Sequence, residues 1–421
     1  MATATRATTA RPHIHSTWNA TLRTTLAAAA VVTLVLLAFA WPTYSAKVKD
    51  MPIAVVATDR QRATLQDRIE RAGGAFEVRS VPDRQAAVDA IERREVYGGI
   101  VLPAGAPGGM EVLTATAGSG PATQMLTGLA QKAGAEQVQA AGNARMAAVQ
   151  DAARLGAQAA AAQASATTLT QTAQALSLNP ASAAQAVAMK QQAATASTTA
   201  AALARRAQAA QTALAAAPAS HVTVTDVVPL SDKDPRGQGF AVAGLPLAMG
   251  GMIGGLLIST LLVGWKPRLV AVAGYAVLGG LLLALVLHGW FGFLQGSFGM
   301  AWLVCALAIG ATAAFITGAQ SLVGKPGIAL GAIATMFVGN PLSSLAMPKE
   351  WLPGAWGEIG QWFVPGAAGT LLRNESYFPR ADGSHAWIAL LCWLLGGVAL
   401  TLVGRHKYDE VVHMEGYTEP D

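Results

Sequence analysis

Few residues in this chain have the type and spacing that chemistry requires. Residues 318–325 end in Gly-Lys, as a phosphate-binding loop does, but Ala319 replaces the first glycine of that motif. Pro326 replaces the Ser or Thr that would contact magnesium. His13 and His15 carry ligand-like atoms, but no acidic residue or cysteine stands near them in the sequence. With no Ser/His/Asp grouping either, we expect no enzyme activity, no metal and no cofactor.

The composition instead indicates a membrane protein with a large part outside the bilayer. Hydrophobic residues make up 52% of the chain and charged residues 13%, whereas a soluble domain carries about 25% charged residues. The net charge of +5 is not gathered in a basic patch, so nucleic acid is not an expected partner. Both cysteines, Cys305 and Cys392, stand in apolar runs, which argues against a disulfide framework.

Six apolar runs are long enough, or nearly so, to cross the hydrocarbon core, which takes about 20 helical residues. They cover residues 22–44, 238–264, 269–290, 300–322, 327–347 and 385–404. Apart from Arg23 in the first run, none contains Asp, Glu, Lys or Arg. The first run has an alternative interpretation as a cleaved signal peptide, because Ala38-Phe39-Ala40 has the small-x-small form of a cleavage site.

Basic residues beside these runs orient the chain by the positive-inside rule. They stand before the first run and in alternate loops: Arg6, Arg11, Arg23, Lys266, Arg268, Lys325, Arg405 and Lys407. We predict an α-helical polytopic membrane protein with six spans and both termini inside the cell. Residues 1–21 and 405–421 are then cytosolic, 238–404 form a five-helix membrane domain, and 45–237 and 348–384 lie outside.

Small residues crowd the second apolar run. Gly250, Gly251, Gly254 and Gly255 form overlapping small-xxx-small pairs, a spacing that lets two helix backbones approach closely. Two interpretations stay open at this stage. The glycines pack against other helices of the same chain, or they form the interface of a homodimer.

The segment after the first run alternates between strand-like and helix-like patterns. Residues 53–57, 76–81, 97–102 and 110–115 are short apolar runs that read as strands, with 221–228 closing the same sheet. Residues 59–71 and a segment that opens at Pro82-Asp83 have helical spacing. We therefore predict an extracytoplasmic α/β domain over residues 45–237.

A long insertion rich in alanine and glutamine interrupts this domain at about residues 121–218. Alanine is the best helix former, and Asn179-Pro180 is a turn signal near the middle of the insertion. We predict two antiparallel helices over about 137–177 and 181–217. Disorder is the alternative, because Gln and Ser contribute little hydrophobic burial.

The loop between the last two runs combines tryptophan with proline and glycine. Trp351, Trp356 and Trp362 recur among apolar neighbours, and tryptophan favours the boundary between membrane and water. We predict one or two short helices in residues 348–384 that lie in the outer leaflet or re-enter it. An ordinary folded outer loop is the alternative.

The apolar runs carry no carboxylates, although proton-driven pumps commonly place Asp or Glu there as relays. Active transport by this chain would therefore take its energy from elsewhere, most simply from a separate ATPase subunit. An apolar bundle also suits a hydrophobic or amphipathic substrate better than an ion.

One span, a large outer domain and five further spans together resemble the ABC-2-type transporter permease family, and within it the YhgE/Pip (phage-infection-protein-like) branch. The segments that carry the resemblance are 53–56, 97–103, Asp234-Pro235-Arg236-Gly237, Gly339-Asn340-Pro341-Leu342 and 362–374. The resemblance places Asn340, Pro341, Pro365 and Gly366 with the three tryptophans in an outer re-entrant region. It also implies that the segment before Leu22 and the turn Trp265-Lys266-Pro267-Arg268 contact an ATPase, although this turn is short for a coupling helix.

The resemblance implies a permease subunit in the bacterial plasma membrane. Two copies would form the pathway for export of a hydrophobic or amphipathic compound, and a separate ATPase would drive it. The alternative is a YhgE/Pip-like surface component that does not transport and uses the helical hairpin as a scaffold, secretion accessory or phage receptor.

Overall fold

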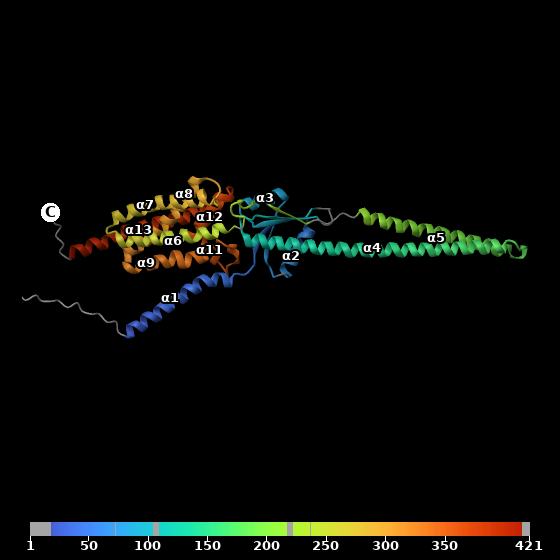
Figure 1. Ribbon diagram of the computed structural model, residues 1–421, viewed down its shortest axis with the longest axis horizontal. Coiled ribbons are helices and arrows are strands. Elements are labelled where there is room, and N and C mark those ends of the chain that lie inside the picture. Colours follow the sequence, from blue (N-terminus) through green and yellow to red (C-terminus); the bar gives the residue numbers. More distant parts are fainter. Residues whose placement is uncertain (1–17, 72, 104–108, 217–221, 236, 415–421) are drawn as a thin grey trace, which may run out of the picture.

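The computed structural model describes residues 18–71, 73–103, 109–216, 222–235 and 237–414. His13, His15, Arg236 and most of the N-terminal segment before Leu22 lie outside these residues. The chain forms three parts in a row, namely a helix bundle, a β-sheet with its helices, and a long helical hairpin that points away from the bundle (Figure 1).

Five helices of the described residues are long and apolar enough to cross a membrane. They belong to α1 (Trp18–Ser45), α6 (Gln238–Leu261), α7 with the π-helical turn η2 (Trp265–Ala284, Leu285–Trp290), α8 (Phe298–Val323) and α13 (Ser384–Met414). The sixth predicted run is not among them; it consists of α9 (Lys325–Ala332), the π-helical η3 (Ile333–Val338) and α10 (Gly339–Leu342) in direct succession. This helical stretch ends at Leu342 rather than at residue 347, and a turn with φ of 53° at Ser344 follows.

Helix α8 is the centre of the bundle. It packs against α6, α7, α9 and α13, and most of its residues are buried, including the small residues Ala308, Gly310 and Ala311. Small side chains let several helices approach one axis. Helix α1 behaves differently, since it contacts η3 and α10 through Phe39 and diverges from the bundle toward its N-terminus (Figure 1).

A five-stranded sheet follows α1 in the order β2-β1-β3-β4-β5. The strands are β1 (Met51–Val56), β2 (Phe76–Ser80), β3 (Gly98–Val101), β4 (Met110–Thr114) and β5 (Val222–Asp226). The β3–β4 pair is antiparallel and the other three neighbouring pairs are parallel. Each strand lies within a residue or two of a predicted one, because alternation and flanking turn residues mark strands locally.

The alternation of side chains along β1 builds two apolar layers. Met51, Ile53 and Val55 face one layer, to which α4 contributes Leu126. Ala54 faces the other layer, which α3 (Arg84–Glu92) covers with Ile91. The remaining helix of this part, α2 (Asp59–Arg71), contributes Leu65 to the first layer.

The hairpin consists of α4 (Gly120–Leu176) and α5 (Ala183–Ala216), joined by the short η1 (Pro180–Ser182). Helix α4 begins at residue 120 rather than at the predicted 137, because Ser119 caps it and Pro121 suits the first turn of a helix. Its N-terminal part packs on the sheet through Leu126 and Ala130. The apolar face that continues from the sheet into the hairpin explains why one helix spans both.

Buried alanines recur at intervals of seven along both hairpin helices. They are Ala152, Ala159, Ala166 and Ala173 in α4, and Ala186, Ala193, Ala200 and Ala207 in α5. A sevenfold repeat keeps one seam facing its partner over many turns, which is the geometry of an antiparallel coiled coil. Alanine seams bring the helices close together but bury little apolar area for each residue.

Substitution on this seam tests the coiled coil. We expect Ala159→Glu to destabilise the hairpin by about 1–3 kcal/mol, because it places a carboxylate between the helices. Trypsin cleavage at the arginines and lysines of α4 and α5, measured on the full chain, should then accelerate. The matched control is Ala160→Glu, one residue away on the exposed face. Equal cleavage rates in the two variants would contradict the seam.

Candidate functional site

A cavity of about 400 Å³ lies where the sheet meets the helix bundle. One wall comes from residues 93–97, which connect α3 to β3, and from Pro52. The other walls come from the turn after α10, from Lys349 and Glu350, and from α12 (Val364–Tyr377). The lining is mostly polar, and it includes Arg94, Tyr97, Arg373 and Asn374.

Arg94 enters this cavity from an unusual backbone position. Helix α3 ends in a Schellman motif, in which Arg94 N–H donates to Ile91 O and Glu95 N–H donates to Ala90 O, both at 2.9 Å. Arg94 occupies the left-handed position of this motif, with φ of 57°. Glycine is usual there, because an L side chain costs roughly 1 kcal/mol in this conformation.

The guanidinium of Arg94 connects the two parts of the molecule. Its Nη1 donates to Oδ1 of Asn374 at 2.6 Å, and its Cζ lies 5.5 Å from the ring centroid of Phe378. Burial lowers the pKa of Arg94 from its ordinary value, while the charges of nearby Tyr97 and Glu350 oppose this shift.

A second cation, Arg373, lies in the same cavity. Its Nη2 donates to the backbone oxygen of Leu345 at 2.8 Å. Burial and, to a smaller extent, the charge of Arg94 lower the pKa of Arg373 to about 9, so it stays protonated at neutral pH. Both guanidinium-bearing residues, Arg94 and Arg373, line this one cavity.

Two of the acidic residues that line the cavity, Glu350 and Glu358, connect different parts of the chain. Glu350 Oε2 accepts a hydrogen bond of 2.9 Å from the hydroxyl of Tyr97, and Glu358 pairs with Lys349 at 2.8 Å. Burial, followed by the charge of Glu350, raises the pKa of Tyr97, so its hydroxyl remains a donor. Tyr97 belongs to the sheet and Glu350 to the outer loop, so this contact also joins the two parts.

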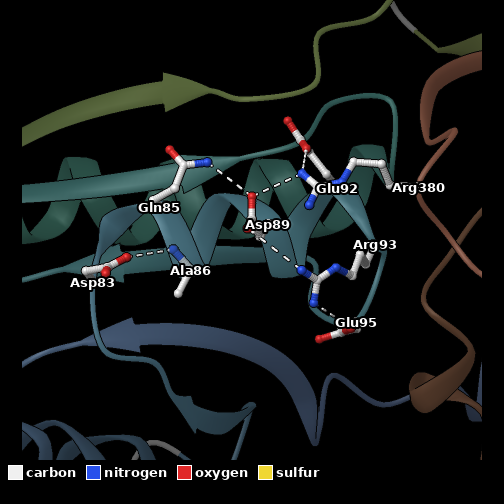
Figure 2. A network of polar contacts seen from close by, with 8 residues as sticks. All are labelled: Asp83, Gln85, Ala86, Asp89, Glu92, Arg93, Glu95 and Arg380. Carbon is white, nitrogen blue, oxygen red and sulfur yellow. Dashed lines mark hydrogen bonds and ion pairs between the residues drawn. The ribbon is translucent and has the colours of Figure 1, made fainter.

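The segment after α12 fastens the junction from outside the cavity. Arg380 donates to Asp89 at 3.0 Å and to Glu92 at 2.5 Å, both on α3 (Figure 2). The hydrogen bond from Arg380, with a smaller one from Gln85, holds the pKa of Asp89 below its ordinary value. Asp83 caps the other end of α3 by accepting from Ala86 N–H at 2.8 Å (Figure 2).

Phe378 sits between these polar contacts and is 1% exposed. It follows α12 directly but packs in the apolar layer of the sheet, with Ile91, Ala115 and Ala117. Tyr377 beside it accepts from Ser231 N–H and donates to Phe293 O, which links the chain on either side of α6. The end of α12 is therefore part of the core of the sheet domain.

The predicted outer residues lie around this junction. Asn340 and Pro341 are in α10, directly before the Ser343–Ser344 turn that lines the cavity. Pro365 and Gly366 are buried at the start of α12, where Gly366 lies against Gly360 O of α11 (Trp356–Gln361). Helix α12 packs into the bundle core through Val364.

The three tryptophans of this region have different environments. Trp356 and Trp362 are about half exposed, in ring contact with Trp41 and His385 respectively. Trp351 does not share this setting, because it packs against the apolar layer of the sheet that contains Met51. The apolar character that suggested a membrane boundary for Trp351 here serves contact with another protein surface.

Comparison with known proteins identifies the family of this chain. The family model described as "ABC-2 family transporter protein" matches residues 21–404. This chain belongs to the ABC-2 transporter family. Searches of curated proteins and of solved structures gave no significant match. The match covers the helix bundle, the sheet and the hairpin alike.

In this ABC-2 chain the predicted ATPase-contacting turn is only partly accessible. Trp265 lies near Lys266 and Arg405, each 5.5 Å from its ring, and Lys266 and Pro267 are exposed. Arg268 is 5% exposed and donates to Leu262 O, Ser259 O and Ser321 Oγ. Arg268 therefore joins the end of α6 to α8, and the exposed side chains of the turn are those of Lys266 and Pro267.

The four glycines of α6 face helices of their own chain. A Cβ at Gly254 would lie 2.1 Å from the ring of Tyr275, and one at Gly251 would lie 2.5 Å from Thr312. Gly255 lies against Ile316, and Gly250 lies near Tyr275 and Ile309. These contacts favour the interpretation of packing within the bundle, so a dimer would need another surface.

Sequence reasoning did not single out Arg94, Arg373, Phe378 or Arg380. One local signal was present, since the helix before Arg94 ends without the glycine that its turn favours. Arg373 had no such signal, because its place beside Arg94 depends on contacts between α12 and a segment about 280 residues earlier in the chain. Only the folded chain brings these residues together.

Removal of Phe378 tests whether it holds the sheet to the bundle. We expect Phe378→Ala to lower the free energy of unfolding by about 3–5 kcal/mol, because it leaves a cavity in a packed layer. Thermal unfolding of the purified chain and trypsin cleavage after Arg380 would measure the change. Tyr44→Ala is the control, since Tyr44 is 93% exposed. Unchanged stability and cleavage in Phe378→Ala would contradict this role.

Proposed function

We propose that this chain is the permease subunit of an ABC exporter in the bacterial plasma membrane, and that it moves a hydrophobic or amphipathic compound. The family match is the observation that carries the proposal. ABC-2 permeases generally work with a separate ATPase. The apolar surface of the bundle and its five candidate spans support a place in the lipid bilayer.

We propose further that α9, η3 and α10 form a sixth span. They make one unbroken helical stretch from Lys325 to Leu342, packed on α8 and α6. With six spans, both termini are cytosolic and the sheet and hairpin lie outside. The exposed rings of Trp356 and Trp362 then fall at the outer membrane surface, as tryptophan prefers.

The exposed part of the inner turn is the proposed contact for the ATPase. Lys266 and Pro267 project at the end of the bundle opposite the sheet, and Arg268 fixes the backbone of the turn to α6 and α8. A rigid turn suits a coupling contact, because force on it reaches two membrane helices. The homodimer is part of the same proposal and would use a surface other than the glycines of α6.

Purification of the tagged chain from its native host tests the ATPase partner. We expect a stoichiometric ATPase subunit to co-purify in mild detergent, and we expect Lys266→Glu to reduce its capture because the charge at the contact reverses. Lys325→Glu, in another loop of the same proposed side, is the matched control. Intact protein without any ATPase would contradict the exporter and favour the second function below.

Cysteine labelling tests the topology. Leu178 at the hairpin turn is 87% exposed, and Lys266 is exposed at the other end of the molecule. In a Cys392→Ala background, Leu178→Cys should react with a membrane-impermeant maleimide on intact cells. Lys266→Cys should react only after permeabilisation. Cys305 stays in place, because it is buried and packed in the bundle core. The reverse labelling pattern would overturn the orientation.

The hairpin favours a second function. It extends away from the sheet (Figure 1), and α5 alone spans about 50 Å at about 1.5 Å for each of its 34 residues. A YhgE/Pip-like surface component would use this projection as a scaffold, secretion accessory or phage receptor. Deletion of residues 152–207 would shorten the hairpin without removing Leu126 from the core of the sheet, and it would then abolish adsorption or secretion while the membrane bundle and its partner persist.

A further inference from the structure

The charges in the junction cavity point to an anionic ligand. Among the described residues, four carboxylates line the cavity, and each has a partner: Glu95 with Arg93, Glu350 with Tyr97, Glu358 with Lys349 and Asp382 with Ser384. Arg94 takes part in none of the ion pairs within 4 Å that these residues form, and its hydrogen bond goes to the neutral Asn374. Two guanidiniums that line one buried cavity repel each other, and an oxyanion bound there would offset that cost.

Backbone strain is concentrated at the same place. The described non-glycine residues with positive φ are Asp50, Arg94 and Ser344, and the last two line this cavity. A glycine at position 94 would fit the helix end better, so the retained arginine indicates a role for its side chain. Strained positions of this kind cluster at ligand sites.

An apolar crevice adjoins the polar cavity and shares Leu345 with it. Leu247 of α6, Ala308 of α8 and Leu372 of α12 line this crevice. The side chain of Leu345 fills the boundary, where its methyl carbons would lie 2.7 Å from a Cβ at Gly244 and closer still to one at Gly369. The crevice holds only about 10 Å³ in this conformation, so Leu345 acts as a plug between a polar and an apolar compartment.

We propose that the junction cavity binds the phosphate headgroup of an amphipathic molecule, with Arg94 and Arg373 as its cationic ligands and Leu345 at the entrance to the path of the apolar tail. Arginine suits this role because its planar donors match the oxygens of phosphate in pairs. A volume of about 400 Å³ is in the range of small-molecule pockets, which is about 300–1,000 Å³. That this molecule is the transported compound rests on the proposed permease function, whereas the binding itself does not.

Binding to the purified full chain in detergent, without ATP or an ATPase, tests the site separately from transport. The probes are dioctanoyl phosphatidic acid, inorganic phosphate and dioctanoylglycerol. We expect saturable binding of the phosphatidic acid, competition by inorganic phosphate only at much higher concentration, and no specific binding of the diacylglycerol. Equal affinity for phosphatidic acid and diacylglycerol would overturn the site, and equal affinity for inorganic phosphate would overturn the headgroup assignment.

Single substitutions test which residues bind the phosphate headgroup. Arg94→Gly and Arg373→Gln should each weaken phosphatidic acid binding about tenfold or more, since each loses a charged hydrogen-bonding partner. Arg94→Gly also relieves the strained backbone, so thermal unfolding can show that the loss is not misfolding. Arg68→Gln, on exposed α2, is the matched control and should bind normally. Unchanged affinity in Arg94→Gly and Arg373→Gln would overturn the assignment.

Leu345→Ala tests the path of the apolar tail separately from the site of the phosphate headgroup. It should tighten binding of phosphatidic acid by opening the crevice, and it should leave the affinity for inorganic phosphate unchanged. An equal change for both probes would overturn the proposed tail path.

Discussion

The insertion of Phe378 into the sheet domain is the contact on which the junction depends. Helix α12 packs in the bundle through Val364 and, one residue after its end, places Phe378 in the other core. A single short segment therefore belongs to two apolar cores. Interiors are close-packed and deform in discrete steps rather than smoothly, so movement of either core would be transmitted to the other.

Polar contacts around Phe378 fix the orientation of the sheet relative to the bundle, which the burial of this side chain alone would not determine. Arg380 donates a hydrogen bond to Asp89 on α3. Arg94 donates one to Asn374, and Tyr97 donates one to Glu350. Each of these bonds crosses from one part of the molecule to the other. Arg94, Asn374, Tyr97 and Glu350 line the cavity, so its shape depends directly on how the sheet sits on the bundle. A ligand in the cavity would consequently favour one arrangement of the two parts, and a change in that arrangement would alter its affinity.

The hairpin is stabilised by different interactions from those at the junction. Its seam is made of alanine at every seventh position, which permits close helix approach while contributing little hydrophobic free energy. Its stability comes from high helix propensity and from the continuous α4, whose first turns are anchored on the sheet by Leu126. A stiff projection is thus obtained from a composition that, by hydrophobicity alone, resembles a disordered chain.

The sequence by itself determined the features that depend on near neighbours along the chain. Apolar runs defined the helices of the bundle, alternation defined the strands, and Asn179-Pro180 marked the hairpin turn. Tertiary structure alone decided which side chains meet. Arg268 reads as a cytosolic charge in the sequence, yet it is buried because the carbonyls of α6 and the hydroxyl of Ser321 receive it. Trp351 reads as a membrane anchor, whereas the fold packs it, partly buried, against an apolar layer of the sheet. Arg94 and Arg373 share a cavity only because α12 ends inside the sheet domain, and no local pattern records a contact between residues so far apart.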